Sequence, residues 1–202
     1  MAYIGTQPNN VKKNIGLYTP SEILQLTKDG SWGGSLELIQ SQNFTSSTAY
    51  IDFTSIKGEK YDVHYLTFNG LSTTVAGVSL FSIRYSTDGG SSYVSSGYQN
   101  AYQDGISSGS FNENRSTSES GLRIGFSYST TLTSGYVYLY NLNNSSKYSF
   151  NSFHSIQDNS RFTFGGGVYP TANTVNAIRV YDVYSLDSGT VKLYGVKQLW
   201  VL

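Results

Sequence analysis

Hydrophobic and polar residues alternate along most of this chain in short runs, and a period of two residues predicts β-strands rather than helices. The clearest run is residues 122–128, where apolar side chains at every second position share one face. The run at residues 136–142 (YVYLYNL) is apolar on both faces, which predicts a strand covered on both sides. Further strands are predicted at residues 35–40, 49–53, 61–69, 78–86, 93–102, 148–156 and 161–169.

Two more runs end the chain, at residues 177–184 and 190–199. Between them, Asp187, Ser188 and Gly189 can supply the backbone angles of a hairpin turn. A terminal strand exposes unpaired backbone groups unless another strand covers its edge. We therefore expect the last strand to pair with residues 35–40. About ten strands closed in this way predict an all-β fold, an antiparallel β-sandwich of the jelly-roll type.

The first 34 residues lack this pattern, and we expect them to form an extended N-terminal arm. Tyr3 and Ile4 form a short apolar patch, and Pro8 breaks the chain after them. Thr19-Pro20-Ser21-Glu22 has the form of a helix cap, which predicts one short helix over residues 22–28. At 202 residues the chain can bury one substantial core, so residues 35–202 are expected to form a single sandwich domain.

Composition supports the β class, since 18 Tyr, 10 Phe and 21 Gly accompany only 13% charged residues. The 13 basic and 13 acidic residues are scattered singly and cancel, which argues against a nucleic-acid partner. We find no polybasic stretch, membrane span or signal peptide and expect no membrane partner. The chain has no cysteine, so disulfides are excluded.

Candidate catalytic and metal-binding motifs are weak. The run Gly165–Gly167 lacks the Lys-Ser/Thr of a phosphate loop and is better explained by close approach of two backbones. His64 and His154 are the only histidines, each within an apolar strand. Asp88 begins a Gly-Gly turn with too few acids for calcium. Neither a nucleophile elbow nor a facing pair of carboxylates is evident. We therefore expect no enzyme, no cofactor and no metal.

Residues 103–121 are rich in Ser, Gly and Asn, which predicts a long exposed loop. Tyr93, Tyr98 and Tyr102 flank it, and Trp32 lies beside two glycines. Such aromatic side chains can contact a glycan or a protein partner, or can simply fill half-buried strand positions.

Subunit contacts are expected at the double-faced strand. Tyr136, Tyr138 and Tyr140 share one face of it. An exposed apolar face of this kind is usually covered. We expect a neighbouring subunit to cover it in a homo-oligomer, with a trimer as the first hypothesis.

Several spaced strings resemble a jelly-roll or lectin-like module of virion proteins in tailed bacteriophages, particularly those of marine and cyanobacterial hosts. They are LTKDGSWGGSLELIQ, IDFTSIKGEKYDVHYLTFNGL, RYSTDGGSSY, YLYNLNNSSKYSF, FGGGVYPTANTVNAIRV and GTVKLYGVKQL, which together span residues 26–199. The opening MAYIG with its following proline is also similar to the start of many phage fibre proteins.

The resemblance implies a structural protein on the surface of the virion, either a tail appendage, a short tail fibre or a capsid decoration protein. It also implies that the arm, through Tyr3, Ile4 and Pro8, joins the protein to other virion proteins. The alternative is a lectin-like module that binds a host surface glycan. A glycan depolymerase would require a carboxylate pair that the sequence does not reveal.

Overall fold

The computed structural model describes residues 19–28, 35–129, 131–158 and 161–197, and this part of the chain is nearly all antiparallel β-structure. The predicted all-β sandwich is therefore confirmed. One helix, α1, spans Pro20–Lys28, and a compact β unit begins at Leu36. The strands are β1 (Leu36–Phe44), β2 (Thr48–Phe53), β3 (Val63–Thr73), β4 (Ser79–Ser86), β5 (Tyr98–Ile106), β6 (Ser110–Glu119), β7 (Leu122–Ser127), β8 (Thr133–Tyr140), β9 (Ser149–Gln157), β10 (Arg161–Tyr169) and β11 (Ala177–Val196).

Helix α1 begins with a capping box, as the sequence predicts. The backbone N–H of Glu22 donates to the Thr19 hydroxyl at 3.3 Å, and the Glu22 carboxylate accepts from the Thr19 N–H at 2.7 Å. This pair satisfies two backbone donors that a helix start leaves free. The hydrogen bond from the Thr19 backbone is the main reason that the pKa of Glu22 lies below its ordinary value. Pro20, which has no N–H to leave unpaired, occupies the first helical position.

The β unit is built around β11, a single strand of 20 residues. Its first half pairs with β2 on one side and β4 on the other. Its second half pairs with β1 and β3 in the same way. On one edge of β11 the chain forms β1 and then β2, and on the other edge it forms β3 and then β4, with a break between the two strands of each pair. The predicted pairing of residues 35–40 with the last strand is confirmed, since Leu36 lies opposite Val196.

The predicted hairpin at Asp187-Ser188-Gly189 is wrong, because the chain bends there without reversing. The pairing register shifts between Tyr181 and Leu186 and twice more before Thr190. Gly189 has a φ of 141°, a conformation open to glycine but strained for other residues. These irregularities bend β11 so that it leaves one layer of the sandwich and enters the other.

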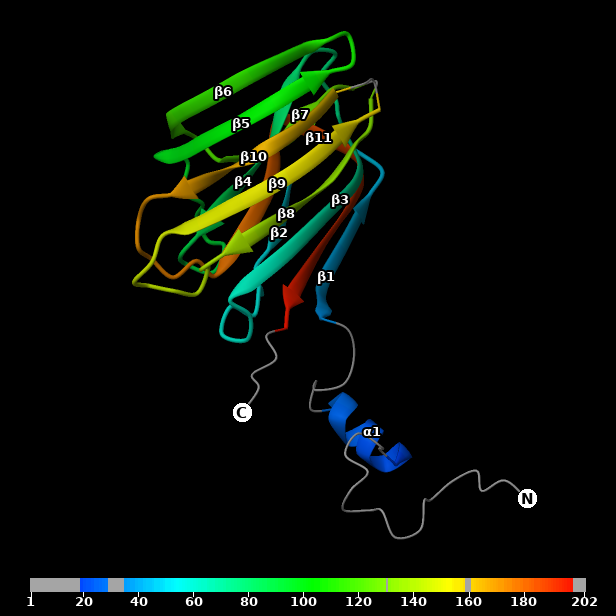
Figure 1. Cartoon of the computed structure of the whole chain (residues 1–202), viewed down its shortest axis with the longest axis vertical. Helices are drawn as coiled ribbons and strands as arrows, with labels where there is room; N and C mark the ends of the chain where they lie inside the picture. The colour runs from blue at the N-terminus through cyan, green and yellow to red at the C-terminus, as the bar shows by residue number, and fades with distance from the viewer. Residues whose placement is uncertain (1–18, 29–34, 130, 159–160, 198–202) are drawn as a thin grey trace, which may run out of the picture. The chain divides into compact units, whose positions relative to one another are not determined.

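The two layers follow from this bend. The larger layer has the order β6-β5-β10-β9-β8-β3 and continues into the second half of β11 and β1. Figure 1 looks onto this layer, with β6 at its top and β3 towards its lower edge. The smaller layer is β7-β4, the first half of β11 and β2, and β7 packs against β10 and β9. The space between the layers holds a core of fully buried side chains that includes Leu66, Phe81, Ile83, Ile124, Leu139 and Val180.

Residues 103–121 do not form the loop that the sequence predicts. They complete β5 and form β6, an antiparallel hairpin in which Ile106 lies opposite Ser110. The polar composition is compatible with a strand here because β6 lies at the edge of the sheet, where backbone pairing suffices and neither face has to be apolar. Asp104 strengthens the hairpin by accepting hydrogen bonds from Asn112 at 3.2 Å and Asn114 at 2.9 Å.

Candidate functional site

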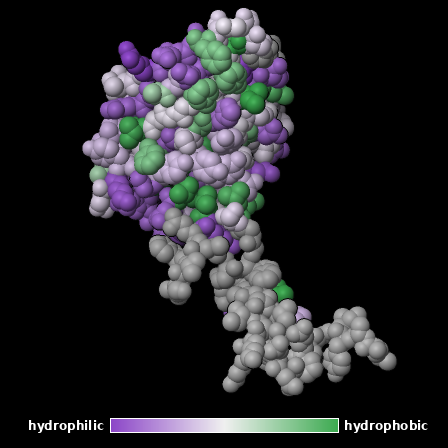
Figure 2. All heavy atoms as spheres, viewed as in Figure 1, coloured by the Kyte–Doolittle hydropathy of each residue, from purple (hydrophilic) through white to green (hydrophobic). Residues whose placement is uncertain are grey.

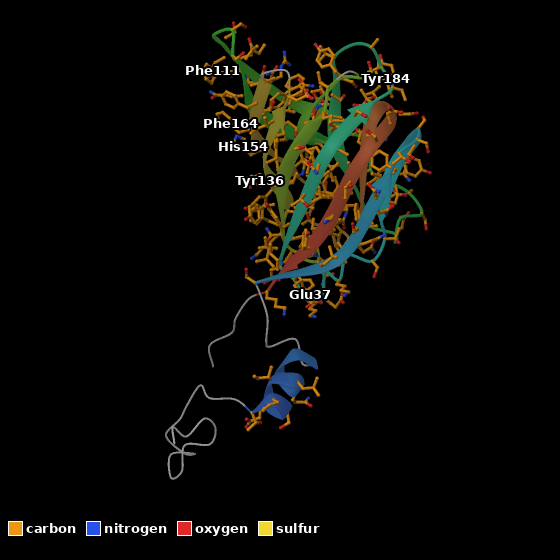
Figure 3. The ribbon with its side chains drawn as sticks, turned by 90° about the vertical axis from the view of Figure 1, so that its right-hand side faces the viewer. Glu37, Phe111, Tyr136, His154, Phe164 and Tyr184 are labelled. Carbon is orange, nitrogen blue, oxygen red and sulfur yellow. The ribbon has the colours of Figure 1, made fainter. Side chains whose placement is uncertain are left out.

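The outward surface of the larger layer carries a continuous set of aromatic rings, called here the aromatic face. Its members come from five strands in the middle of the layer and from β6, and all are exposed or half-buried. They are Tyr65, Phe111, Tyr136, Tyr138, Tyr140, Phe150, His154, Phe162, Phe164 and Tyr194. Figure 3 shows four of them, Phe111, Phe164, His154 and Tyr136, along the same side of the sheet.

The rings on this face support one another through direct contacts. Tyr65 and Tyr138 have centroids 4.8 Å apart, and Tyr140 stacks on Phe150 at the same distance with an interplanar angle of 23°. His154 stands edge-on to Phe164 at 6.2 Å. Ring pairs at such separations are attractive beyond their buried area, so the rings restrict one another's orientation.

A row of small side chains crosses this face at right angles to the strands. The register places Tyr138, Ser152, Gly166, Ala101 and Arg115 side by side on β8, β9, β10, β5 and β6. Neighbouring strands are about 4.8 Å apart, so the row is about 19 Å long. Its middle consists of a hydroxymethyl group, a hydrogen atom and a methyl group. The Tyr138 ring stands at one end and the Arg115 side chain at the other.

Larger side chains in the two neighbouring rows stand on either side of this floor. They are Phe150, Val168 and Gln99 on one side and His154, Phe164 and Gln103 on the other. Three shallow hollows of ≈ 500, 570 and 680 Å³ adjoin here, because the first shares Ala101 and Arg115 with the second and Phe164 with the third. Floor, walls and hollows together form what we call the aromatic groove.

Polar groups are placed along the aromatic groove. The Tyr140 hydroxyl and the Ser152 hydroxyl are 3.2 Å apart and share one hydrogen bond. Near β6 the Gln103 amide donates to the Glu113 carboxylate at 3.2 Å. Arg115 contributes a positive charge beside them. The groove therefore combines flat apolar surfaces with hydroxyl, amide and charged groups at its floor and its β6 end.

Of the two tyrosines on β5 that the sequence singles out beside residues 103–121, Tyr98 lies outside this groove and Tyr102 lines one of its hollows. Tyr98 is fully buried, and its hydroxyl accepts from the Tyr85 N–H at 2.8 Å, so it is not available to a ligand. Burial is the main cause that raises the pKa of Tyr98 far above its ordinary value. Tyr102 points into the sandwich, where its ring contacts Phe126 and Phe153.

Tyr93 lies in the loop before β5 and contacts a different cluster. Its ring lies 4.0 Å from the guanidinium of Arg179, which also pairs with Asp52 through two hydrogen bonds of 2.7 Å. Burial, followed by the charge of Asp52, raises the pKa of Tyr93 to about 12. Trp32, Tyr3, Ile4 and Pro8 lie outside the described residues.

The three tyrosines expected at a subunit contact do share one face. Tyr136 and Tyr138 are exposed by 38% and 36%, and Tyr140 is half-buried beside them. The opposite face of β8 is covered within the chain, since Val137 and Leu139 are fully buried in the core. The sequence therefore identified the outward aromatic residues of β8, and their role in a homo-oligomer stays a prediction.

The other candidate motifs have structural roles in the described residues. The Nε2 of His64 is 2.7 Å from the Ile56 carbonyl oxygen inside the core. The Asp88 carboxylate accepts from the Ser92 hydroxyl and N–H and so closes a turn. Gly165–Gly167 lies within β10, where a Cβ on Gly166 would come 2.5 Å from a neighbouring backbone oxygen.

No group of three or more potential metal ligands occurs among the described residues. Within that part of the chain, no helix is long and apolar enough to cross a membrane. Comparison with known proteins adds no assignment: no protein-family model matches the chain, and a search of curated proteins finds no match.

Proposed function

We propose that this chain is a non-enzymatic, glycan-binding protein on the surface of a tailed-bacteriophage particle, and that the aromatic groove holds the glycan. The observation that carries the binding part is the row Ser152–Gly166–Ala101, a floor of minimal side chains between walls of aromatic rings. Sugar rings fit such a floor, which spans about 10 Å from Ser152 to Ala101 within the row of about 19 Å.

The chemistry of the groove suits a sugar better than an apolar ligand. Sugar rings present C–H groups on their faces and hydroxyls at their edges, so they stack on aromatic rings while amides and carboxylates pair with the hydroxyls. The wall rings of Phe150 and Phe164 are each 39% exposed. Gln103 and Glu113 line one hollow of the groove together with Phe164. Figure 2 shows hydrophobic groups separated by hydrophilic ones on this side, rather than one continuous hydrophobic patch.

The virion part of the proposal rests on the sequence resemblance. In this proposal residues 1–34 are the arm that joins other virion proteins through Tyr3, Ile4 and Pro8. The sandwich is then displayed as a tail appendage, a short tail fibre or a capsid decoration. Displaying a glycan-binding groove at the particle surface would let the phage recognise its host cell.

A second use of the aromatic face is the subunit contact expected from Tyr136, Tyr138 and Tyr140. Its exposed rings favour that reading, since soluble monomers usually cover such patches. The two uses are separable by position, because Tyr138 stands at one end of the row and Ala101 lies beside Arg115 at the other. Equilibrium sedimentation at micromolar concentration measures the oligomer directly, and Tyr138→Glu is expected to yield folded monomers if this contact forms.

The glycan proposal is tested by filling the groove. Ala101 is exposed on β5, so Ala101→Trp places an indole on the floor without entering the core. Ala49 is equally an exposed strand alanine, on β2, and Ala49→Trp is the matched control. Both variants are applied with the wild-type protein to an array of bacterial capsular and lipopolysaccharide-derived glycans, after circular dichroism has confirmed that they fold.

We expect the wild-type and Ala49→Trp proteins to bind the same glycans and Ala101→Trp to lose them by at least about tenfold, because blocking a stacking site removes more than 1.4 kcal/mol. A wild-type protein that binds nothing on the array, or an Ala101→Trp variant that binds as well as the control, would refute the groove. For the virion part, phage particles are imaged with the chain labelled. Absence of label from the particle surface contradicts that part alone.

A further inference from the structure

We infer that the glycan carries an anionic substituent, a carboxylate, sulfate or phosphate group, and that Arg115 at the β6 end of the aromatic groove binds it. This inference rests on the proposed function and specifies its ligand class. It starts from a contrast among the five arginines of the chain.

Four of these arginines are held by partners. Arg179 pairs with Asp52 at 2.7 Å, and Arg161 lies 3.8 Å from Asp104 and 4.2 Å from the Phe126 ring. Arg123 pairs with Glu119, and the Nε of Arg84 donates to the Ser120 carbonyl oxygen at 2.8 Å. Each of these side chains is half-buried, and its charge is used within the fold.

Arg115 differs from them in both respects. It is exposed, and its side chain makes no hydrogen bond, ion pair or ring contact within the described part of the chain. Its position is nevertheless fixed, because β6 pairs through the whole hairpin and places Arg115 opposite Ala101. A guanidinium on a paired strand at the meeting point of two hollows can bind a carboxylate, sulfate or phosphate group through two parallel hydrogen bonds.

Glu113 limits how much negative charge the ligand can carry. It lies two residues before Arg115 on the same face of β6, and its carboxylate is occupied by the Gln103 amide. A ligand with an anion on every sugar would place one of them against this carboxylate. The ligand class is therefore a glycan with isolated anionic groups, one facing Arg115 and neutral sugars over the floor, rather than a dense polyanion.

The test combines a protein variant with a ligand variant. The probes are acidic bacterial capsular polysaccharides, each printed beside its carboxyl-reduced neutral derivative, with dextran sulfate as the dense polyanion. The proteins are wild type, Arg115→Gln, Arg115→Lys and Lys147→Gln. Lys147 is exposed between β8 and β9, where it lines a separate hollow with Tyr140 and Phe150. Its variant therefore removes the same charge near the groove without changing any residue of the row from Tyr138 to Arg115.

We expect Arg115→Gln to weaken binding of the acidic glycans by about tenfold or more, the usual size of a charge-assisted hydrogen bond. The neutral derivatives should bind the wild type and Arg115→Gln alike, and Lys147→Gln should match the wild type throughout. Arg115→Lys should fall between, since lysine keeps the charge but loses the paired geometry. Dextran sulfate should bind more weakly than the best acidic glycan.

Three results overturn the inference while leaving the groove in place. They are equal losses for acidic and neutral forms in Arg115→Gln, a loss in Lys147→Gln as large as that in Arg115→Gln, and strongest binding to dextran sulfate. Failure of the wild type to bind any glycan instead refutes the proposed function, and the inference falls with it.

Discussion

His64 makes the stability of the β unit depend on pH in a window where few other groups titrate. The side chain is fully buried on β3, and its ring lies edge-on to Tyr61 at 6.0 Å. With Nε2 only 2.7 Å from the Ile56 carbonyl oxygen, we assign the proton to this nitrogen. The other ring nitrogen is buried with no hydrogen-bond partner in the described residues. Burial is the main cause that lowers the pKa of His64 from its ordinary value of 6.5.

The sign of this pH dependence follows from which state of the protein, folded or unfolded, binds the proton of His64 first as the pH falls. Below about pH 6.5 this imidazole becomes protonated in the unfolded chain while it stays neutral in the folded chain. The free energy of unfolding therefore falls as the pH falls. The slope is at most about 1.4 kcal/mol per pH unit for one proton, and it ends at the folded pKa. Above pH 6.5 the contribution is fully present and constant.

Urea unfolding of the wild type, His64→Gln and His154→Gln between pH 8 and pH 5 measures this directly. Glutamine keeps a donor for the Ile56 carbonyl but cannot be protonated, so His64→Gln should lose the slope between pH 6.5 and 5. His154→Gln, which changes the only other histidine, should keep the slope that His64 causes. A flat wild-type profile, or an equal slope in His64→Gln, would refute the reasoning.

Two further predictions concern single residues of the scaffold. Gly195→Ala should lower the free energy of unfolding by about 1–3 kcal/mol, because a methyl group there overlaps the buried Tyr61 ring, whereas Gly77→Ala, with open space around it, should be tolerated in the same thermal melts. Hydrogen bonds from the Ser92 side chain and backbone lower the pKa of Asp88 from 3.8 to about 2. The stabilisation from these hydrogen bonds is present above pH 3.8 and is lost towards pH 2. The melting temperature should therefore fall more steeply between pH 4.5 and 2.5 in the wild type than in Asp88→Asn. Equal profiles would contradict this.

The sequence predicted the fold class because the period-two pattern is a property of each strand taken alone. The pairing of β1 with β11 could also be predicted, because a terminal strand needs a partner for its edge. The error at Asp187-Ser188-Gly189 has a physical reason. The same backbone angles serve a hairpin and a bend, and the choice depends on partner strands that continue on both sides of β11.

The hairpin of β5 and β6 escaped prediction for a related reason. An edge strand needs only backbone hydrogen bonds on one side, so its side chains carry little pattern. The groove floor could not be predicted from the sequence either. Ala101, Ser152 and Gly166 are distant in sequence and unremarkable in type, and only the pairing register brings them into one row. The outward tyrosines of β8 could be found because their strand is apolar on both faces.

The distribution of polarity across β5, β9 and β10 is a second reason to propose a function for the aromatic face. Strands of a two-layer sandwich normally turn apolar residues inward and polar residues outward. Here much of the inward side is polar and buried, and the members are Asn100, Asp104, Asn151, Ser155, Gln157 and Thr163. The outward side carries exposed Phe150, Ile156 and Phe164, and exposed Phe111 lies beside them on β6.

The outward half of this arrangement does not help the fold, and the inward half helps it only where a buried polar group has a partner. Burying polar groups costs free energy unless each finds a partner, and aromatic rings left in water gain nothing from burial. Some buried groups do find partners, since Asn100 donates to the Gly121 carbonyl at 2.9 Å and Asn151 to the Arg123 carbonyl at 3.3 Å, which ties β7 beneath the layer. The outward rings contact one another, but no other part of the described chain covers their exposed surfaces. A sequence that keeps them there, around a floor of small side chains, is compatible with the proposals that a glycan or a neighbouring subunit covers them.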